Sequence, residues 1–574
     1  MIAASAWAGV LAVVSAKAPP AVKRVPTLPA TRAAEPPLKA TPQAPCGPGS
    51  MPETDIQGRV PRADVESGRT AKGYTCNTEM AGSYTKPDQQ GTVGGFKVER
   101  YTDEHGRVCA YYDSTLLYPT NLLATESGVN VLDMTDPTHP QLTDRLVTPA
   151  MQSPHESLLV NQKRGLLGAV LGNPAFYPGE FDLYDVSQDC RHPVIKSTTP
   201  TGVLGHESGW SPDGQTFYSA SPSSKTIIAI DVSNPSAPVP LSYYGVDSHG
   251  LSISADGNRA YVAGTGSGLH ILDTSEVQER KSNPQLHEIA HLEWGSMSIP
   301  QNAEPITING HPYLIEADEF GTLSQVGAAR LIDIGDETHP KVASNLRLAV
   351  HQPENFDKES GDPNASEALQ GYAAHYCGVP KRIEPGITAC SMIESGLRIF
   401  DIRDPKHPRE IGYFNAPITD RATPAPFEAS NWAMSRPAFD EQRGDIWYSD
   451  GYQGFFVVHM TNGTWPFPKC KGSTATLGVY TAKTKGTKGA DVIVGRSMAD
   501  RIATKGGRDK LCGRGGKDRI KGGTGKDVLR GGNANDRIVS GPGRDRIDCG
   551  RGHHDIVYAG RRDHLRRCEN VKRA

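Results

Sequence analysis

Seven aspartates in the carboxyl-terminal part of the sequence stand nine residues apart. They are Asp491, Asp500, Asp509, Asp518, Asp527, Asp536 and Asp545. An aliphatic residue follows two positions after each one, and glycine fills much of the space between. Calcium takes oxygen ligands from carboxylates and backbone carbonyls, and glycine lets the backbone turn towards the ion. The period therefore predicts a parallel β-roll with acidic turns that hold calcium and a thin aliphatic core.

The best copy of the motif is the run GGTGKDVL at residues 522–529, which fits G-G-x-G-x-D-x-U. On this motif the tail, over about residues 489–565, resembles the RTX (hemolysin-type) calcium-binding repeat family. The resemblance implies that glycine turns and aspartates bind calcium between successive coils. The calcium-binding residues that it implies are Asp509, Asp518, Gly523, Gly525, Asp527, Asp536, Gly543 and Asp545. The alternative is a glycine-rich solenoid that binds nothing and is held by its aliphatic ladder.

The charge of the tail works against calcium. Residues 485–574 contain 23 Lys and Arg against 11 Asp and Glu, whereas the rest of the chain is acidic. Neighbouring cations such as Arg508 and Lys510 lower calcium affinity by repulsion, and they could pair with the aspartates in place of the metal. A basic surface can also bind nucleic acid or cell-surface polyanions. Because no aromatic residues are interleaved for base stacking, we do not expect sequence-specific nucleic-acid binding.

A second set of residues suited to chemistry consists of histidines that precede apolar runs, several with a glutamate beside them. The candidate metal ligands are His155, Glu156, His206, Glu207, His249 and His375. Imidazoles with neighbouring carboxylates can bind zinc or a transition metal, and histidine can also act as a general acid or base. The alternative is that each histidine belongs to a repeat and hydrogen-bonds a neighbouring strand.

A larger repeat must position these histidines. An apolar run that ends in aspartate and leads into a polar turn recurs seven times. The runs are 129–134, 181–186, 227–232, 269–273, 329–334, 397–402 and 455–460, the last with His459 in place of aspartate. Each unit has room for four short strands, and turn signals such as Ser211-Pro212-Asp213-Gly214 separate the apolar runs. Seven such units predict an all-β protein with a seven-bladed β-propeller.

Over about residues 93–468 the chain resembles the LVIVD-repeat propeller proteins, in runs such as Leu331-Ile332-Asp333-Ile334. The resemblance implies a fold and says little about function. Because the first strand of each propeller blade lines the central channel, we expect the histidines of different blades to converge there. The aspartate after each apolar run is expected to accept hydrogen bonds from the next turn. The alternative fold is a pair of stacked β-sandwiches.

The amino terminus indicates export. Residues 2–16 are apolar and small, and an A-x-A cleavage site ends at Ala18, which predicts a signal peptide over residues 1–18. The run is short for a membrane span, and an uncleaved anchor is the alternative. The ten cysteines fit an oxidising compartment. We expect Cys377 to pair with Cys390, and Cys549 with Cys568.

The sequence thus predicts a secreted, extracellular or cell-surface protein of two domains. The predicted segments are a signal peptide (1–18), a proline-rich linker and lead-in (19–75), the propeller (76–470), a second linker (471–488) and the RTX-like repeats (489–574). The first hypothesis is a non-catalytic calcium-binding protein that recognises a protein, a glycan or a cell-surface polyanion. The alternative is a metal-dependent propeller enzyme, an oxidoreductase or hydrolase, that uses the channel histidines. No complete catalytic motif is present in the sequence.

Overall fold

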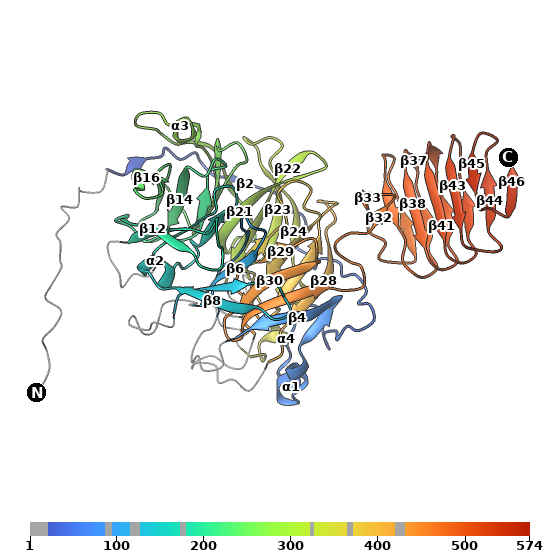
Figure 1. The fold of residues 1–574 in the computed structure, drawn as a ribbon, viewed down its shortest axis with the longest axis horizontal. Coiled ribbons are helices and arrows are strands. Elements are labelled where there is room, and N and C mark those ends of the chain that lie inside the picture. Colours follow the sequence, from blue (N-terminus) through green and yellow to red (C-terminus); the bar gives the residue numbers. More distant parts are fainter. Residues whose placement is uncertain are drawn as a thin grey trace, which may run out of the picture.

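The computed structural model of the chain describes residues 21–85, 94–114, 127–172, 179–321, 326–363, 365, 371–418 and 431–573. The predicted signal peptide lies outside these residues. The described residues form a seven-bladed β-propeller followed by a parallel β-roll (Figure 1). None of the helices in the described part of the chain has the length and apolarity needed to cross a bilayer.

Seven four-stranded antiparallel blades form the propeller, as the seven repeats predicted. Blades one to four consist of β5–β8 (Val98–Thr102, Val108–Asp113, Val129–Asp133, Gln141–Leu146), β9–β12 (Leu159–Asn161, Leu166–Val170, Glu180–Asp185, Val194–Pro200), β13–β16 (Ser208–Trp210, Thr216–Ser221, Thr226–Asp231, Val239–Gly245) and β17–β20 (Gly250–Ile253, Arg259–Gly264, Gly268–Asp273, His287–Glu293). Blades five to seven consist of β21–β24 (Ile299–Ile308, His311–Glu319, Ala329–Asp333, Lys341–Leu346), β25–β28 (Tyr376–Gly378, Ile387–Ser391, Leu397–Asp401, Arg409–Asn415) and β29–β31 (Ala438–Asp440, Asp445–Asp450, Gly454–Met460) completed by β4 (Thr78–Tyr84).

The last blade takes its outer strand from the beginning of the chain. β4 pairs antiparallel with β31, with Thr78 opposite Met460 and Tyr84 opposite Phe455. This pairing closes the ring and leaves blade seven with four strands like the others. Ring closure covers strand edges that would otherwise offer unpaired backbone groups.

Each apolar run of the repeat is the third strand of its blade, and its side chains are buried between neighbouring blades, as Leu331 and Ile399 are. The aspartate that ends the run caps the following turn, as expected. Asp133 accepts the backbone N–H of Thr135 at 2.9 Å, and Asp401 accepts that of Arg403 at 3.0 Å. The repeat therefore encodes both the blade core and the turn that ends its third strand.

Short helices and additional strands lie at the periphery of the propeller. The helices are α1 (Arg62–Glu66), α2 (Pro149–Gln152), α3 (Ser275–Gln278) and α4 (Phe356–Glu359), with 3-10 turns at Arg69–Lys72, Ala349–His351 and Pro353–Asn355. The strands are β1 (Lys23–Arg24), β2 (Thr31–Arg32) and β3 (Tyr74–Cys76), which extend blades three, four and six. The described part of the proline-rich segment thus runs along the outer edges of these blades.

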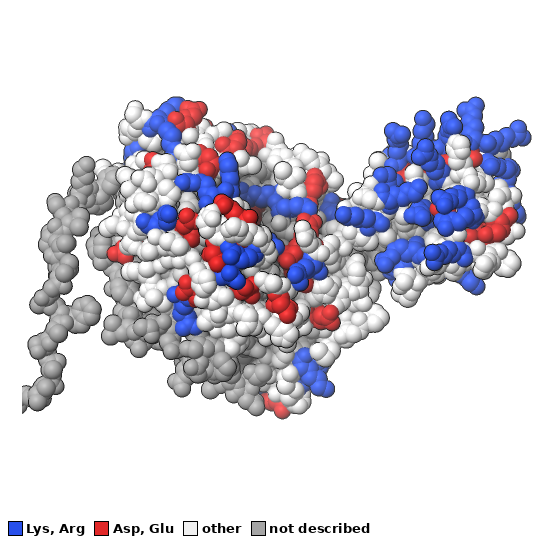
Figure 2. Space-filling model, viewed as in Figure 1, with Lys and Arg blue, Asp and Glu red and all other residues white. Residues whose placement is uncertain are grey.

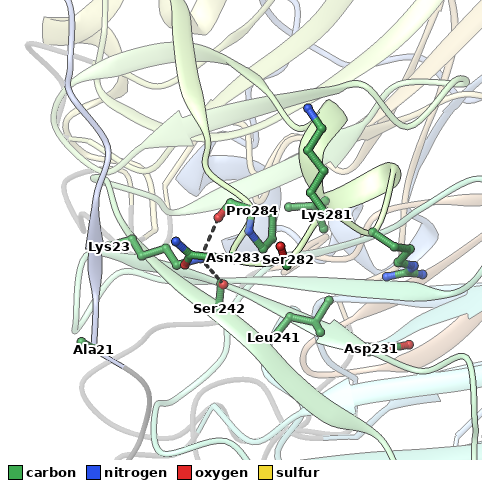
Figure 3. Close-up of a pocket in the computed structure, with 11 residues that line it drawn as sticks. Ala21, Lys23, Asp231, Leu241, Ser242, Lys281, Ser282, Asn283 and Pro284 are labelled. Atoms are coloured by element: carbon green, nitrogen blue, oxygen red, sulfur yellow. Dashed lines mark hydrogen bonds between the residues drawn. The ribbon is translucent and has the colours of Figure 1, made fainter.

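Lys23 shows how this segment is attached. Its Nζ donates to Ser242 Oγ at 2.8 Å and to the Pro284 carbonyl at 2.7 Å (Figure 3). These residues line a cavity of about 630 Å³ beside α3. None of the candidate metal ligands lines it, so this cavity is separate from the channel site.

The tail is a roll of two parallel sheets on opposite faces (Figure 1). One sheet consists of β34 (Lys483–Lys485), β36 (Arg501–Ala503), β39 (Arg519–Lys521), β42 (Arg537–Val539), β44 (Ile556–Ala559) and β46 (Asn570–Arg573). The other consists of β35 (Val492–Val494), β38 (Lys510–Arg514), β41 (Val528–Gly532), β43 (Arg546–Gly550) and β45 (His564–Arg566). Shorter pairs are β32 (Lys469–Cys470) with β33 (Ser473–Thr474), and β37 (Gly506–Gly507) with β40 (Thr524–Gly525). The predicted aliphatic ladder is buried between the two sheets, from Ile493 to Ile547.

Five disulfides hold loops and coils together. Cys377 pairs with Cys390 and Cys549 with Cys568, which confirms both expected bridges. The others join Cys46 to Cys76, Cys109 to Cys190 and Cys470 to Cys512. All ten cysteines are therefore oxidised, in keeping with an extracellular protein.

Candidate functional site

Histidines from four blades meet in the propeller channel. His155, His206 and His249 stand just before the inner strands β9, β13 and β17. Their rings follow one another at centroid distances of 4.5 Å and 4.4 Å. His375 stands just before β25 of blade six and faces Glu156 and Glu319, which also contact His206 and His249 respectively. The histidines that occupy the same position in different repeats therefore lie close together in the structure.

Two glutamates join these histidines. Glu156 Oε2 lies 3.0 Å from His206 Nδ1, and its Oε1 lies 3.4 Å from His375 Nε2. Glu319 was not found from the sequence, yet its carboxylate lies 3.0 Å from His375 Nε2 and 3.3 Å from His249 Nε2. It ends β22 and pairs with Ile299 at the start of the inner strand β21, which places it at the same end of the channel.

Backbone carbonyls fix the orientation of two imidazoles. Nδ1 of His249 lies 2.8 Å from the Pro300 carbonyl, and Nδ1 of His375 lies 2.6 Å from the Met434 carbonyl. A carbonyl oxygen only accepts, so each Nδ1 must carry the proton that it donates. Each ring then turns Nε2 towards Glu319. In neutral rings these nitrogens are acceptors facing an acceptor, an arrangement that a proton or a metal cation between them would relieve.

The surroundings of His375 and His155 shift the pKa values of these two histidines in opposite directions. Burial opposes the charge on His375, but the carboxylates of Glu156 and Glu319 outweigh it and raise its pKa to about 10. Burial and the neighbouring His206 lower the pKa of His155 to about 3. Without a metal, His375 therefore carries a proton at neutral pH, whereas His155 is neutral.

Polar groups from other blades hold Glu156. The Tyr376 hydroxyl donates to Glu156 Oε2 at 2.6 Å, and Gln301 donates to the same oxygen. Glu207 follows His206 in the chain but forms a buried ion pair with Lys97, in which Oε1 of Glu207 lies 2.6 Å from Nζ of Lys97. The predicted residues His155, Glu156, His206, His249 and His375 are thus brought together, whereas Glu207 faces a lysine. Gln301 and Tyr376 were also missed, because neither belongs to the His-Glu pattern.

Next to the histidine cluster, the inner strands line a cleft of about 560 Å³. Its walls carry Trp210, Glu207 and an ionic network in which Arg436 contacts Glu304 at 2.6 Å and Arg382 contacts Glu304 at 3.3 Å. Glu207 lines the cleft and borders the histidine cluster. The cleft is a polar space suited to a small charged or hydroxylated molecule.

A second His-Glu group, in blade four, has a different character. His270 contacts Glu288 through Nδ1 at 2.5 Å and Ser267 Oγ through Nε2 at 2.8 Å. His291 contacts the Leu28 carbonyl through Nδ1 at 3.1 Å and the Ser267 carbonyl through Nε2 at 2.5 Å. The contact of His291 with the Leu28 carbonyl therefore fastens the amino-terminal segment to the blade, and all four ring nitrogens of the group already have protein partners.

In the roll, each ladder aspartate from Asp509 onwards accepts a hydrogen bond from the preceding coil. Asp527 Oδ1 accepts the backbone N–H of Asp509 at 2.9 Å, and Asp545 Oδ1 accepts that of Asp527 at 2.9 Å, one coil of 18 residues apart. The other carboxylate oxygen is buried and accepts no hydrogen bond within the described residues. This holds for Asp509, Asp518, Asp527, Asp536, Asp545 and Asp555. Asp555 takes the place in the ladder where the nine-residue count gives His554.

These unpartnered oxygens fit calcium. They are buried carboxylates close to glycine turns, and calcium prefers such oxygens together with backbone carbonyls. Among the nine-residue aspartates that the structure describes, basic side chains contact only Asp500, which Arg496 contacts at 2.8 Å. Asp491 is likewise satisfied, by the backbone and hydroxyl of Thr487. Among the described aspartates of the ladder, those with an unpartnered carboxylate oxygen thus begin at Asp509.

Glycine is required where successive coils touch. A Cβ on Gly525 would lie 1.6 Å from the Gly507 carbonyl oxygen, and one on Gly543 would lie 1.7 Å from that of Gly525. Gly523 adopts a φ of 81°, in the left-handed region. These three predicted glycines therefore allow the close stacking that brings carbonyl oxygens and carboxylates together.

Two sequence families match parts of the chain. The RTX calcium-binding nonapeptide repeat, in four copies, matches residues 513–547, and the LVIVD repeat matches residues 223–244 and 249–289. The chain is thus a propeller with LVIVD repeats followed by RTX repeats, and the RTX repeats imply calcium binding. None of the curated proteins is similar enough to match.

Solved structures with a similar arrangement share little sequence with this chain. A protein of unknown function from Desulfotomaculum acetoxidans is 11% identical, with a TM-score of 0.39 over 64% of this chain and 89% of its own. A periplasmic gluconolactonase from Pseudomonas aeruginosa is 13% identical, with a TM-score of 0.38 over 64% and 95%. The hydrazine synthase of Kuenenia stuttgartiensis is 14% identical, with a TM-score of 0.33 over 50% and 70%.

Proposed function

We propose that this chain is an exported metalloprotein in which the propeller channel binds a transition metal or zinc ion for catalysis and calcium orders the tail. RTX repeats and five disulfides are consistent with an extracellular location. The propeller contributes a buried cluster of histidine and glutamate side chains. A solely structural role for the histidines, the alternative considered from the sequence, accounts less well for this arrangement.

The observation that carries the proposal is the direction of the imidazoles. His249 and His375 donate Nδ1–H to backbone carbonyls and turn Nε2 towards one carboxylate. Metal-binding histidines in proteins use this arrangement, in which a backbone acceptor fixes the ring so that the other nitrogen can coordinate. The blade-four group, with every ring nitrogen occupied, is a contrasting case within the same propeller.

The donor set limits the metal and its chemistry. Imidazole nitrogens with carboxylate oxygens and no thiolate suit zinc, iron, copper or manganese. Two three-residue groups share Glu156: His155 with His206, and Glu319 with His375. A bound ion would act as a Lewis acid or a redox centre for a substrate. The neighbouring cleft, with Trp210 and the Arg436–Glu304 pair, supplies a place for a small polar substrate.

Metal analysis of the full purified chain tests the proposal. We expect a stoichiometric transition metal or zinc ion that is lost in the double variant His206→Ala, His375→Ala. The matched control is His270→Ala, His291→Ala, which removes two histidines from the blade-four group and should leave the metal content unchanged. Circular dichroism would establish that both variants fold. A folded wild-type chain that binds no such metal after incubation with zinc, copper, iron or manganese would refute the proposal.

A further inference from the structure

The surface of the roll carries almost only positive charge. Between Lys485 and Arg573 there are 23 basic and 11 acidic residues. Ten of the acidic residues are buried aspartates, and only Glu569 is exposed. None of the 23 basic residues is buried. Folding therefore divides the charges, with most carboxylates inside and the cations outside, and Figure 2 shows many Lys and Arg residues, and far fewer Asp and Glu residues, on the visible face of the roll.

The cations also form regular columns. Parallel pairing places four exposed basic residues in register on one sheet, which we name the strand column: Lys483, Arg501, Arg519 and Arg537. The residues that precede Asp509, Asp527, Asp545 and Asp563, which stack on one edge of the roll, form a second set, the turn column: Arg508, Lys526, Arg544 and Arg562. Neighbours in register on adjacent strands are ~4.8 Å apart.

Such columns are unfavourable without a counter-charge. Like charges directly opposite on neighbouring strands destabilise a sheet. None of the eight side chains forms an ion pair with a carboxylate among the residues that the structure describes. The stacking of Arg537 on Tyr558 is a contact with a neutral ring. A ligand with a row of anions would relieve the repulsion along a column.

We propose that the roll binds an extended acidic polysaccharide, whose carboxylates or sulfates lie along these columns. A repeated row of single cations suits a linear polymer with one anion at each regular step. The tyrosines of the roll are Tyr480, Tyr558 and no others, and Tyr558 is covered by Arg537 and Lys572, so the surface lacks the stacked aromatic platform that binds single-stranded nucleic acid. Calcium bound to the buried aspartates would add to the positive field, so calcium and the polysaccharide should favour each other's binding.

Binding of the full chain to immobilised heparin tests this proposal, with neutral dextran and single-stranded oligothymidylate as the comparison ligands. The column variant is Arg501→Gln, Arg519→Gln, Arg537→Gln. The matched control is Lys517→Gln, Arg551→Gln, Arg566→Gln, which removes the same charge from exposed positions of the roll outside both columns. We expect the column variant to lose at least about tenfold in affinity and to have a shallower salt dependence, by roughly one unit for each lost contact.

The outcomes separate the possible explanations. The proposal is supported if heparin binds at physiological ionic strength, dextran does not, and the column variant is weakened more than the control. Equal weakening of the two variants would show that net charge alone drives binding and would overturn the proposal. Tighter binding of oligothymidylate would assign the surface to nucleic acid instead. No binding to either polyanion would also overturn it. Because the channel is untouched, each result is independent of the metal proposed for the propeller.

Discussion

The carboxylate of Glu319 lies 3.0 Å from Nε2 of His375, and the proton on the opposite nitrogen of that imidazole points at a backbone carbonyl. The contact joins the neighbouring blades five and six. Glu319 is therefore a candidate metal ligand, as the histidines are, although it does not belong to a repeated sequence motif. The side chain also faces His249, so one carboxylate serves two blades.

Glu319→Gln should weaken metal binding. The amide keeps the size of the side chain but removes the charge that would neutralise a cation between His249 and His375. We expect a loss of about tenfold or more in zinc affinity, in the range seen when groups that support a metal site are altered. Competition with a chelating dye measures it. Glu293→Gln, at the end of β20, is the control, and an unchanged affinity for Glu319→Gln would remove this carboxylate from the site.

Asp527→Asn should reduce the response of the roll to calcium. Asp527 has a buried oxygen without a partner, whereas both oxygens of Asp500 accept hydrogen bonds from Arg496. We therefore expect Asp527→Asn to lower the calcium-induced protection of roll peptides in hydrogen exchange. Asp500→Asn is the matched control and should retain that protection while losing stability without calcium. The opposite pattern would mean that calcium binds elsewhere.

The calcium-free roll should become less stable as the pH rises. Burial, with added repulsion between coils, raises the pKa of Asp518 and Asp536 to about 7. Unfolded aspartate titrates near pH ~3.9, so this contribution to stability is complete below that pH and is lost as the pH rises through about 7. Roll peptides in chelator should exchange more slowly at about pH 5 than at about pH 8. Saturating calcium should abolish or reverse this order, because the metal binds the ionised form. The exchange rates are first corrected for the pH dependence of intrinsic exchange. Faster corrected exchange in chelator at about pH 5 than at about pH 8 would contradict the prediction.

Removing the last disulfide should loosen the end of the roll. Cys549 and Cys568 close a loop with a sequence separation of 19. Cross-linking a loop of this length stabilises the folded state by about 3 kcal/mol in the chain-entropy account. Cys549→Ser, Cys568→Ser should therefore destabilise the last coils, seen as faster hydrogen exchange at β44 and β46. The wild-type chain in reductant is the comparison. Exchange rates equal to those of the oxidised wild type would show that the bridge adds nothing.

Repetition made much of this molecule predictable. The seven apolar runs became the third strand of each blade, and the nine-residue aspartates became the two edges of the roll. The histidine register led to the channel cluster because equivalent positions in a ring of blades converge. In each case a local pattern carried information about a distant contact, since the symmetry of the fold brings equivalent positions together.

Residues outside the repeats could not be found in this way. Glu319 ends a second strand, and Gln301 lies within an inner strand; neither has an equivalent in the other blades that would draw attention to it. Glu207 repeats the His-Glu pattern of Glu156 but faces Lys97, a partner 110 residues away. The division of charge in the roll was also hidden, because composition gives the number of carboxylates and not their burial.

The position of β4 has a consequence for how the molecule is made. Thr78 to Tyr84 precede all the other strands of the seven four-stranded blades, yet their partner β31 ends only at Met460. A chain threaded through a narrow pore with its amino terminus first would therefore arrive with its ring open. The circle could close only after nearly the whole propeller had passed, with the calcium-binding coils still to follow. The pairing of β4 with β31, which closes the propeller, would thus be a late step of both synthesis and transport.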